Sequence, residues 1–134
     1  MPTAAEEIHA HYAEIAEVFP RFDLAAFRRC WELPALLTLP DAVVALPDEA
    51  AFERVFGGMM ESLRQQGLTR SVPERINLHV FGPATALASV LWTRYAGERV
   101  LERLGATYTL VRRDGEWRVN ALIAHDPAQV IPLG

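Results

Sequence analysis

The chain has 134 residues, of which 51% are hydrophobic and 22% are charged, and its formal net charge is −4 at pH 7. This length fits one domain with a single core, and the composition is typical of a globular protein rather than of a disordered or membrane-spanning one. The negative net charge argues against nucleic-acid binding, which usually requires a basic face.

The first predicted elements are two helices. Residues 3–19 have apolar positions at spacings of three and four, which predicts an amphipathic helix. Its apolar face carries Ile8, Tyr12, Ile15 and Phe19. Pro20 ends this helix, and Asp23 is a suitable N-cap for a short second helix over residues 24–31. The second helix stops before Pro34, because a residue that precedes proline disfavours helical geometry.

A hairpin and a third helix are predicted next. Residues 35–39 and 42–46 are short apolar runs separated by a Pro-Asp pair, a pattern that indicates two short strands around a turn. Asp48 is then an N-cap for a helix that reaches about Gln66. The apolar stripe of this helix consists of Phe52, Val55, Phe56, Met59 and Leu63.

The rest of the chain is predicted to form strands. Glycine-containing turns divide it into strands over residues 74–81, 86–96, 101–113 and 116–125. Residues 126–134 are expected to be a loose end. Helices first and long antiparallel strands afterwards are typical of the α+β class, in which a curved sheet has helices packed on one face. We therefore predict a single domain over residues 1–134, with its core in about 5–126.

The chain resembles a known superfamily. The segment Asp23-Leu24-Ala25-Ala26-Phe27, the closing VRRDGEWRVNALIAH and the order of elements are similar to the nuclear transport factor two-like superfamily, in its SnoaL-like or ketosteroid isomerase-like branch. The resemblance covers residues 5 to about 126. It implies a cone-shaped, curved antiparallel or mixed sheet wrapped around the three N-terminal helices, with a pocket at the open end. It also implies a homodimer formed through the outer sheet face.

Strand alternation predicts which side chains face the helices. In the last strand these are Trp117, Val119, Ala121, Ile123 and His125. The strand before it allows either alternation, with Thr107, Thr109 and Val111 inward or Tyr108 and Leu110 inward. Comparison with the isomerase branch favours the first set, and on the strand before that it favours Ser89, Leu91, Thr93 and Tyr95 inward. The outer face would then carry Val90, Trp92, Tyr108 and Leu110, an apolar area that suits a dimer interface. A register error of one residue would exchange the two faces.

The acid–base groups of the isomerase branch are missing from this sequence. Ketosteroid isomerase-like enzymes use a carboxylate base, a tyrosine and a protonated acid. The resemblance places the tyrosine at Ile15, the base at Leu39 and the second acid at Thr109. Because these side chains cannot take over the proton transfers, we expect the usual steroid isomerase mechanism to be absent.

His125 is the best remaining candidate for a proton carrier. Alternation turns it inward near the mouth of the predicted cone, and histidine titrates near neutral pH. Tyr12 and Tyr95 are its candidate partners in catalysis. The alternative is that His125 only ends its strand, half in water. His79 alternates with an apolar set and is expected at the surface or in an interface.

Metal and cofactor chemistry find little support in the sequence. His9 and His11 are two residues apart on a helix and therefore point to nearly opposite sides. No HExxH or paired CxxC motif occurs, so we expect no metal site. All thirteen basic residues are arginines, which excludes Schiff-base chemistry and a lysine-bound pyridoxal cofactor, and we expect no cofactor. Cys30 is expected to be a buried, unreactive thiol.

The expected location is the cytoplasm. No apolar run approaches the ~20 residues that a membrane-spanning helix needs, and residues 1–11 lack a signal-peptide pattern. With one cysteine the chain forms no internal disulfide, so nothing requires an oxidising compartment. We expect neither a membrane nor a nucleic acid as partner.

The function predicted from the sequence is the binding of a small, mostly apolar molecule in an internal pocket. The expected pocket wall consists of Tyr12, Ile15, Phe19, Trp31, Leu39, Phe56, Tyr95, Thr107, Thr109, Trp117, Val119 and His125. The first alternative is an isomerase, cyclase or dehydratase for a small carbonyl compound, with His125 and Tyr12 or Tyr95 as proton carriers. The second is a non-catalytic protein whose dimer or sheet surface binds a partner.

Overall fold

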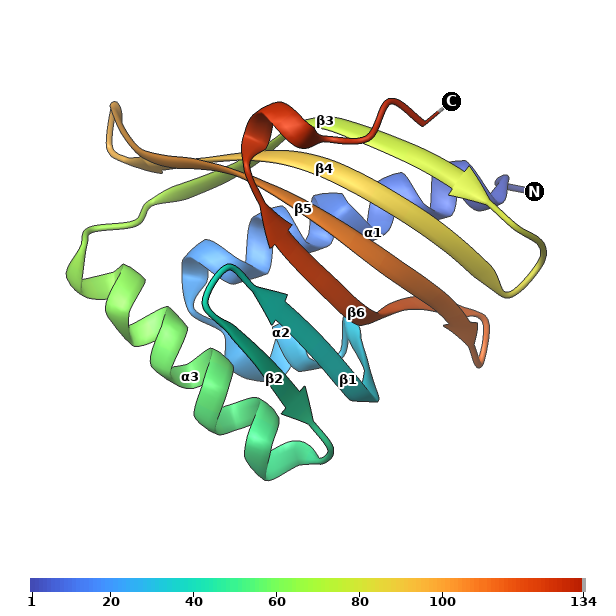
Figure 1. Cartoon of the computed structure of the whole chain (residues 1–134), viewed down its shortest axis with the longest axis horizontal. Helices are drawn as coiled ribbons and strands as arrows, with labels where there is room; N and C mark the ends of the chain where they lie inside the picture. The colour runs from blue at the N-terminus through green and yellow to red at the C-terminus, as the bar shows by residue number, and fades with distance from the viewer. Residues whose placement is uncertain (134) are drawn as a thin grey trace.

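A computed structural model describes residues 1–133 as an α+β fold with three α-helices and one six-stranded sheet (Figure 1). The helices are α1 (Ala4–Val18), α2 (Leu24–Arg28) and α3 (Glu49–Gln65). The strands are β1 (Trp31–Leu39), β2 (Ala42–Leu46), β3 (Arg70–Val80), β4 (Thr85–Ala96), β5 (Arg99–Arg113) and β6 (Glu116–His125). Short 3₁₀ turns, η1 (Phe19–Arg21) and η2 (Pro127–Gln129), follow α1 and β6.

Side-chain caps start the helices at the predicted places. The Asp23 carboxylate accepts a hydrogen bond from the Ala26 amide at 3.0 Å, and Asp48 accepts one from the Ala51 amide at 2.9 Å. Thr3 and the residue three positions later form a reciprocal capping box at the start of α1. These bonds satisfy amide groups that have no partner inside the first helical turn. None of the helices described is long and apolar enough to cross a membrane.

The sheet is curved and mixed, as predicted, and it is not closed into a barrel. Its strand order is β2-β1-β6-β5-β4-β3. All neighbouring strands are antiparallel except β1 and β6, which run parallel. Figure 1 shows α1 behind β4 and β5, with α3 beside the β1–β2 hairpin. The sheet therefore has one face turned towards the helices, called the inner face here, and an opposite outer face.

A bulge in β6 changes which side chains face the helices. Thr109 pairs with Ala121 and Leu110 pairs with Val119, so Asn120 is an extra residue in β6. Strand alternation restarts after it. The inner face of β6 carries Trp117, Val119, Leu122 and Ala124. The prediction that Ala121, Ile123 and His125 also face inward is therefore wrong, and Ile123 is 49% exposed.

The facing predicted for β4 and β5 is also wrong by one residue. The inner face carries Val90, Trp92, Tyr108 and Leu110, all of which are buried in the core. The outer face carries Ser89, Thr93, Thr107 and Thr109. Apolar residues occupy both alternations of β4, so its pattern fits either facing. The set with the larger apolar side chains faces the helices, because burying it removes more apolar surface from water.

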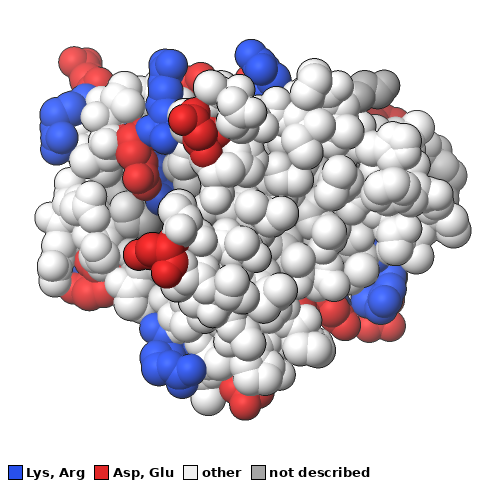
Figure 2. Space-filling model, in the orientation of Figure 1, with Lys and Arg blue, Asp and Glu red and all other residues white. Residues whose placement is uncertain are grey.

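The outer face is mostly uncharged. Figure 2 shows charged side chains chiefly around the edge of this view, with an uncharged area over the strands. The exposed apolar side chains there are those of Leu36, Val43 and Ile123, which lie on neighbouring strands. The apolar set from which a dimer interface was inferred is instead buried against the helices. The homodimer through the outer face stays a prediction.

The C-terminal segment lies across the outer face instead of forming a loose end. The Ile131 amide donates to Ser89 Oγ at 2.8 Å, and Asn77 Nδ2 donates to the Ile131 carbonyl at 2.8 Å. Ser89 Oγ is 2.9 Å from Thr107 Oγ1, which is 2.8 Å from His125 Nε2. Hydrogen bonds therefore tie Ile131 to β3 and β4, and the prediction of a loose end is wrong for residues 126–133.

Gly105 provides the space in which His125 and this segment pack. A Cβ at Gly105 would meet the His125 ring and would lie 2.8 Å from the carbonyl oxygen of Asp126. Because that oxygen belongs to the backbone, Gly105→Ala is expected to displace the segment and to lower the free energy of unfolding by about 1–3 kcal/mol. Urea denaturation measures this change.

Gly58→Ala is the matched control, because a Cβ at Gly58 has no heavy atom within 4 Å. Gly58 lies inside α3, where alanine is favoured over glycine by roughly 0.5–1 kcal/mol. We therefore expect opposite signs for the two substitutions. Equal effects would contradict the packing of His125 against Gly105.

Candidate functional site

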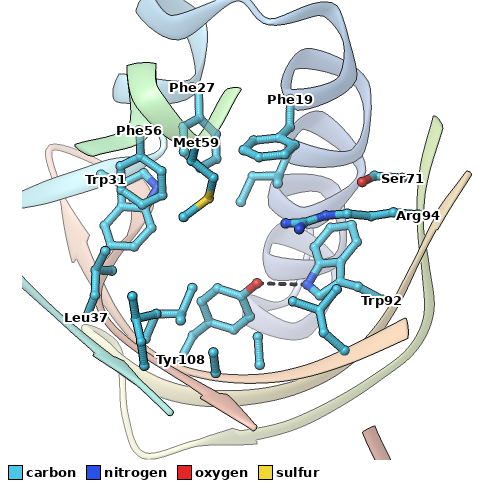
Figure 3. Close-up of a pocket in the computed structure, with 16 residues that line it drawn as sticks. Phe19, Phe27, Trp31, Leu37, Phe56, Met59, Ser71, Trp92, Arg94 and Tyr108 are labelled. Atoms are coloured by element: carbon cyan, nitrogen blue, oxygen red, sulfur yellow. Dashed lines mark hydrogen bonds between the residues drawn. The ribbon is translucent and has the colours of Figure 1, made fainter. Parts of the chain in front are cut away.

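An apolar cavity of ≈ 120 Å³ lies between the helices and the inner face of the sheet (Figure 3). The helices and η1 contribute Ile15, Phe19, Phe27, Phe56 and Met59. The first strand contributes Trp31, Leu37 and Leu39. The longer strands contribute Ser71, Trp92, Arg94, Leu104, Ala106, Tyr108, Leu122 and Ala124. The wall is thus assembled from segments that are far apart in the sequence.

One wall of the cavity is a cluster of aromatic rings. The Trp31 ring centroid lies 5.0 Å from that of Phe56, and Phe56 lies 5.1 Å from Phe27 and 4.8 Å from Phe52. These residues come from β1, α2 and α3, so their packing joins the three elements. Aromatic pairs at these separations stabilise a core beyond the area they bury. This wall is therefore expected to be rigid.

The opposite wall carries a hydrogen-bonded tryptophan–tyrosine pair. Trp92 Nε1 donates to Tyr108 Oη at 2.8 Å. An indole nitrogen is only a donor, so Tyr108 accepts, and its own hydroxyl hydrogen has no acceptor among the described residues. Burial raises the pKa of Tyr108, which therefore stays protonated at neutral pH and remains a donor. Figure 3 shows its hydroxyl group pointing towards the middle of the cavity.

Arg94 is the one charged residue among those that line the cavity in the described chain. Its Nη1 pairs with the Glu102 carboxylate, and its guanidinium lies 5.2 Å from the centroid of the Phe19 ring. The Arg94 side chain is 16% exposed, whereas that of Glu102 is 46% exposed. Arg94 thus brings a largely buried cation to the cavity, while its partner stays at the surface.

Part of the predicted wall lines the cavity. Ile15, Phe19, Trp31, Leu39 and Phe56 do so. Three predicted residues are buried on the inner side but lie outside the lining, namely Tyr12, Trp117 and Val119. Three others, Thr107, Thr109 and His125, lie on the outer face because of the register described above. Tyr95 is the next-to-last residue of β4, and the Arg70 guanidinium stacks 4.3 Å from its ring centroid.

The candidate catalytic residues are not brought together. His125 Nδ1 donates to the Asp126 carbonyl at 2.9 Å, and its Nε2 is hydrogen-bonded to the Thr107 hydroxyl at 2.8 Å. Tyr12 is fully buried, and its hydroxyl has no partner within the described residues. Burial raises the pKa of Tyr12, which therefore remains protonated. Since Tyr95 lies elsewhere, these three side chains do not form one site.

Sequence reasoning missed Arg94 and the Trp92–Tyr108 pair. A usable signal exists in β4, where Val90, Trp92 and Arg94 alternate on one face. Once the large apolar residues are placed inward, Arg94 necessarily follows them to the end of the core. The predicted register placed this face outward, so Arg94 was not recognised as a cavity residue.

A second, more polar cleft of ≈ 350 Å³ lies between α1, α2 and the β5–β6 turn. His11 and Cys30 line it. Burial lowers the pKa of His11 to about 4 and raises the pKa of Cys30 to about 12, so neither is charged at neutral pH. A protonated thiol is a poor nucleophile. In residues 1–133, no group of three or more His, Cys, Asp or Glu side chains is placed to hold a metal ion.

Comparison with known proteins identifies the family. The family described as NTF2-like protein (DUF6841) matches residues 5–127. The chain belongs to this NTF2-like family. The predicted superfamily is thereby confirmed, whereas the SnoaL-like branch stays a prediction. No curated protein matches the chain.

Solved structures share the NTF2-like fold. Aln2 from a Streptomyces species superposes with a TM-score of 0.76 at 20% identity, over 97% of this chain and 96% of that protein. An NTF2-like protein with a cystatin-like fold from Novosphingobium aromaticivorans gives 0.71 at 19% identity, over 90% and 80% of the two chains. An NTF-2 like protein of unknown function from Shewanella oneidensis gives 0.71 at 12% identity, over 92% and 100%. At these identities the likeness shows the fold alone.

Proposed function

We propose that this NTF2-like protein binds one small, mostly apolar molecule in the cavity between the helices and the sheet. The observation that carries the proposal is an apolar space of ≈ 120 Å³ bounded by aromatic rings on one side and by Trp92, Tyr108 and Arg94 on the other. An apolar cavity of about 150 Å³ holds one benzene molecule in other proteins. The space here is of similar order but smaller, so the largest ligand expected in it is one with a single ring.

The lining favours binding over proton transfer. Among the described lining residues there is no aspartate, glutamate, histidine or cysteine. General acid–base catalysis works best with a group whose pKa lies near the working pH. Tyr108 does not meet this condition because burial raises its pKa, and Arg94 does not because a guanidinium stays protonated in proteins. Such groups orient a ligand without exchanging protons with it.

Ala124→Leu is expected to weaken the binding of toluene, used as an apolar probe, by roughly tenfold or more. Ala124 lines the cavity beside its strand partner Ala106, and a leucine side chain there occupies space that the probe needs. Chemical shifts of backbone amides, followed by NMR during a toluene titration, measure the affinity.

Ala121→Leu is the matched control for this titration. Ala121 lies on the same strand and is also half-buried, but it faces the outer side of the sheet. We expect this variant to bind toluene as the unmodified protein does. The proposed function fails if the unmodified protein binds no toluene, or if both leucine variants bind it equally well.

A further inference from the structure

The polar side chains of the cavity are mainly hydrogen-bond donors. Tyr108 accepts from Trp92 and has its own hydroxyl hydrogen left over. Arg94 uses Nη1 for Glu102, and the described residues show no bond from its Nε or Nη2. On the facing wall, the buried Trp31 Nε1 also lacks an acceptor in the described chain. Within residues 1–133, the lining includes no carboxylate or side-chain amide that would supply an acceptor.

The arrangement of these donors defines two ends of the cavity. Figure 3 shows Arg94 above Trp92, and Tyr108 nearby with its hydroxyl group towards Trp92. Leu37, Phe56 and Trp31 lie on the other side of the same space. A ligand is therefore expected to place its acceptor atoms near Arg94 and its apolar body against the aromatic wall.

The charge of Arg94 adds to this selection. A guanidinium has five hydrogens in a fork that matches a carboxylate, and Glu102 occupies one nitrogen only. The side chain is largely buried, so a second ion pair made inside the cavity is screened less than one in water. The described residues show no bond from Nε or Nη2 of Arg94, so these donors are available to a ligand.

We propose that the ligand is a small monocarboxylate with an apolar body the size of one ring, and that Arg94 with the Tyr108 hydroxyl binds its carboxylate. The proposal rests on the proposed function, since it names the chemical class that the same cavity accepts. It makes Arg94 the residue that determines specificity, whereas the aromatic wall supplies affinity without regard to charge.

Three probes with the same ring test this inference: benzoate, benzamide and toluene. Isothermal titration at pH 7 and low salt is expected to show benzoate binding about 10- to 100-fold more tightly than benzamide, because benzoate forms an ion pair with Arg94 whereas benzamide offers only a neutral acceptor. Arg94→Met should abolish this preference, which is read within each variant as the ratio of benzoate affinity to benzamide affinity. Arg94→Lys keeps the charge without the fork and should reduce the preference partially.

Two further variants provide controls. Arg103→Met removes the same charge from an exposed position on β5 outside the cavity, and should keep the preference for benzoate. Glu102→Gln removes the competing carboxylate from Arg94 and should tighten benzoate binding severalfold. If Arg103→Met changes the benzoate affinity as much as Arg94→Met does, the preference for benzoate comes from the overall charge of the protein. This outcome would overturn the assignment of Arg94.

The outcomes separate the two proposals. If toluene binds but benzoate gains nothing over benzamide, the monocarboxylate inference is overturned while the proposed function stands. If benzoate is preferred equally before and after Arg94→Met, the role of Arg94 is overturned. If none of the three probes binds, both proposals fail. Circular dichroism of each variant confirms that it is folded before titration.

Discussion

Trp31→Ala is expected to lower the free energy of unfolding by about 3–5 kcal/mol. Trp31 is 1% exposed, and its ring packs against those of Phe27, Phe52 and Phe56 at centroid distances between 5.0 and 6.1 Å. Truncation leaves a void at the junction of β1, α2 and α3. The remaining rings hold these three elements in place, so the void collapses only partly. The midpoint and slope of urea denaturation measure the loss.

Trp31→Phe is the informative comparison for this prediction. A phenylalanine keeps one ring in the cluster and removes an indole N–H that has no partner in the described chain. We therefore expect a loss of only about 1 kcal/mol, mainly from the smaller volume. If Trp31→Ala costs no more than Trp31→Phe, the aromatic cluster does not stabilise the fold as its packing indicates.

His11 is expected to make the protein less stable as the pH falls from about 6.5 towards 4. Burial, the larger cause, lowers the pKa of folded His11 from 6.5 to about 4, although a hydrogen bond with the Trp117 backbone opposes the shift. Within this pH window the unfolded chain takes up a proton that the folded protein does not, so acid favours unfolding. The contribution of neutral His11 to the free energy of unfolding is fully present above pH 6.5. It is lost as the pH falls to about 4, and the loss amounts to about 3 kcal/mol.

Urea denaturation at pH 7.5 and pH 5 tests this dependence. His11→Gln removes the titrating group, so its stability should fall less between the two pH values than that of the unmodified protein. His9→Gln is the control, because His9 is exposed on the same helix. A pH dependence that stays unchanged in His11→Gln would show that His11 is not the group responsible.

Local signals predicted where the helices begin, whereas α2 ends at Arg28 instead of residue 31 and β1 begins at Trp31 instead of residue 35. Asp23 and Asp48 cap the helices that follow them, and each cap acts within three residues along the chain. The Asp114-Gly115 turn also lies where the sequence places it, with both residues at positive φ. These features depend on neighbouring residues only, so one sequence contains nearly all the information they require.

The facing of the strands depends on distant residues, and it was predicted wrongly for β4, β5 and the second half of β6. Asn120 is the extra residue in β6, and its Oδ1 accepts a hydrogen bond from Thr109 Oγ1 on β5 at 2.6 Å. Nothing in the sequence around Asn120 indicates a bulge. Every side chain beyond a bulge changes face. Arg94 and Tyr108 lie on β4 and β5, where apolar residues fit either facing, so they were placed on the wrong side, whereas Phe19 and Trp31 were placed correctly at the cavity.

The C-terminal segment shows a similar dependence on distant contacts. Ser89 and Thr107 look like exposed or pocket-lining hydroxyls in the sequence, yet both are buried on the outer face. They are satisfied by each other, by His125 and by the Ile131 amide. Val130, which is 9% exposed, was an available signal, since an apolar residue near the end of a chain gains by being covered.

The parallel pairing of β1 with β6 has a consequence for the order of folding. Leu37 of β1 pairs with Leu122 of β6. One edge of β1 therefore has no hydrogen-bonding partner until nearly the whole chain is present. Contacts between such distant segments close large loops and slow the search for the native state. During synthesis, α1, α2 and the β1–β2 hairpin emerge long before β6 exists. Aromatic surface that later bounds the cavity is thus exposed in the growing chain, which makes this stage the one most open to aggregation.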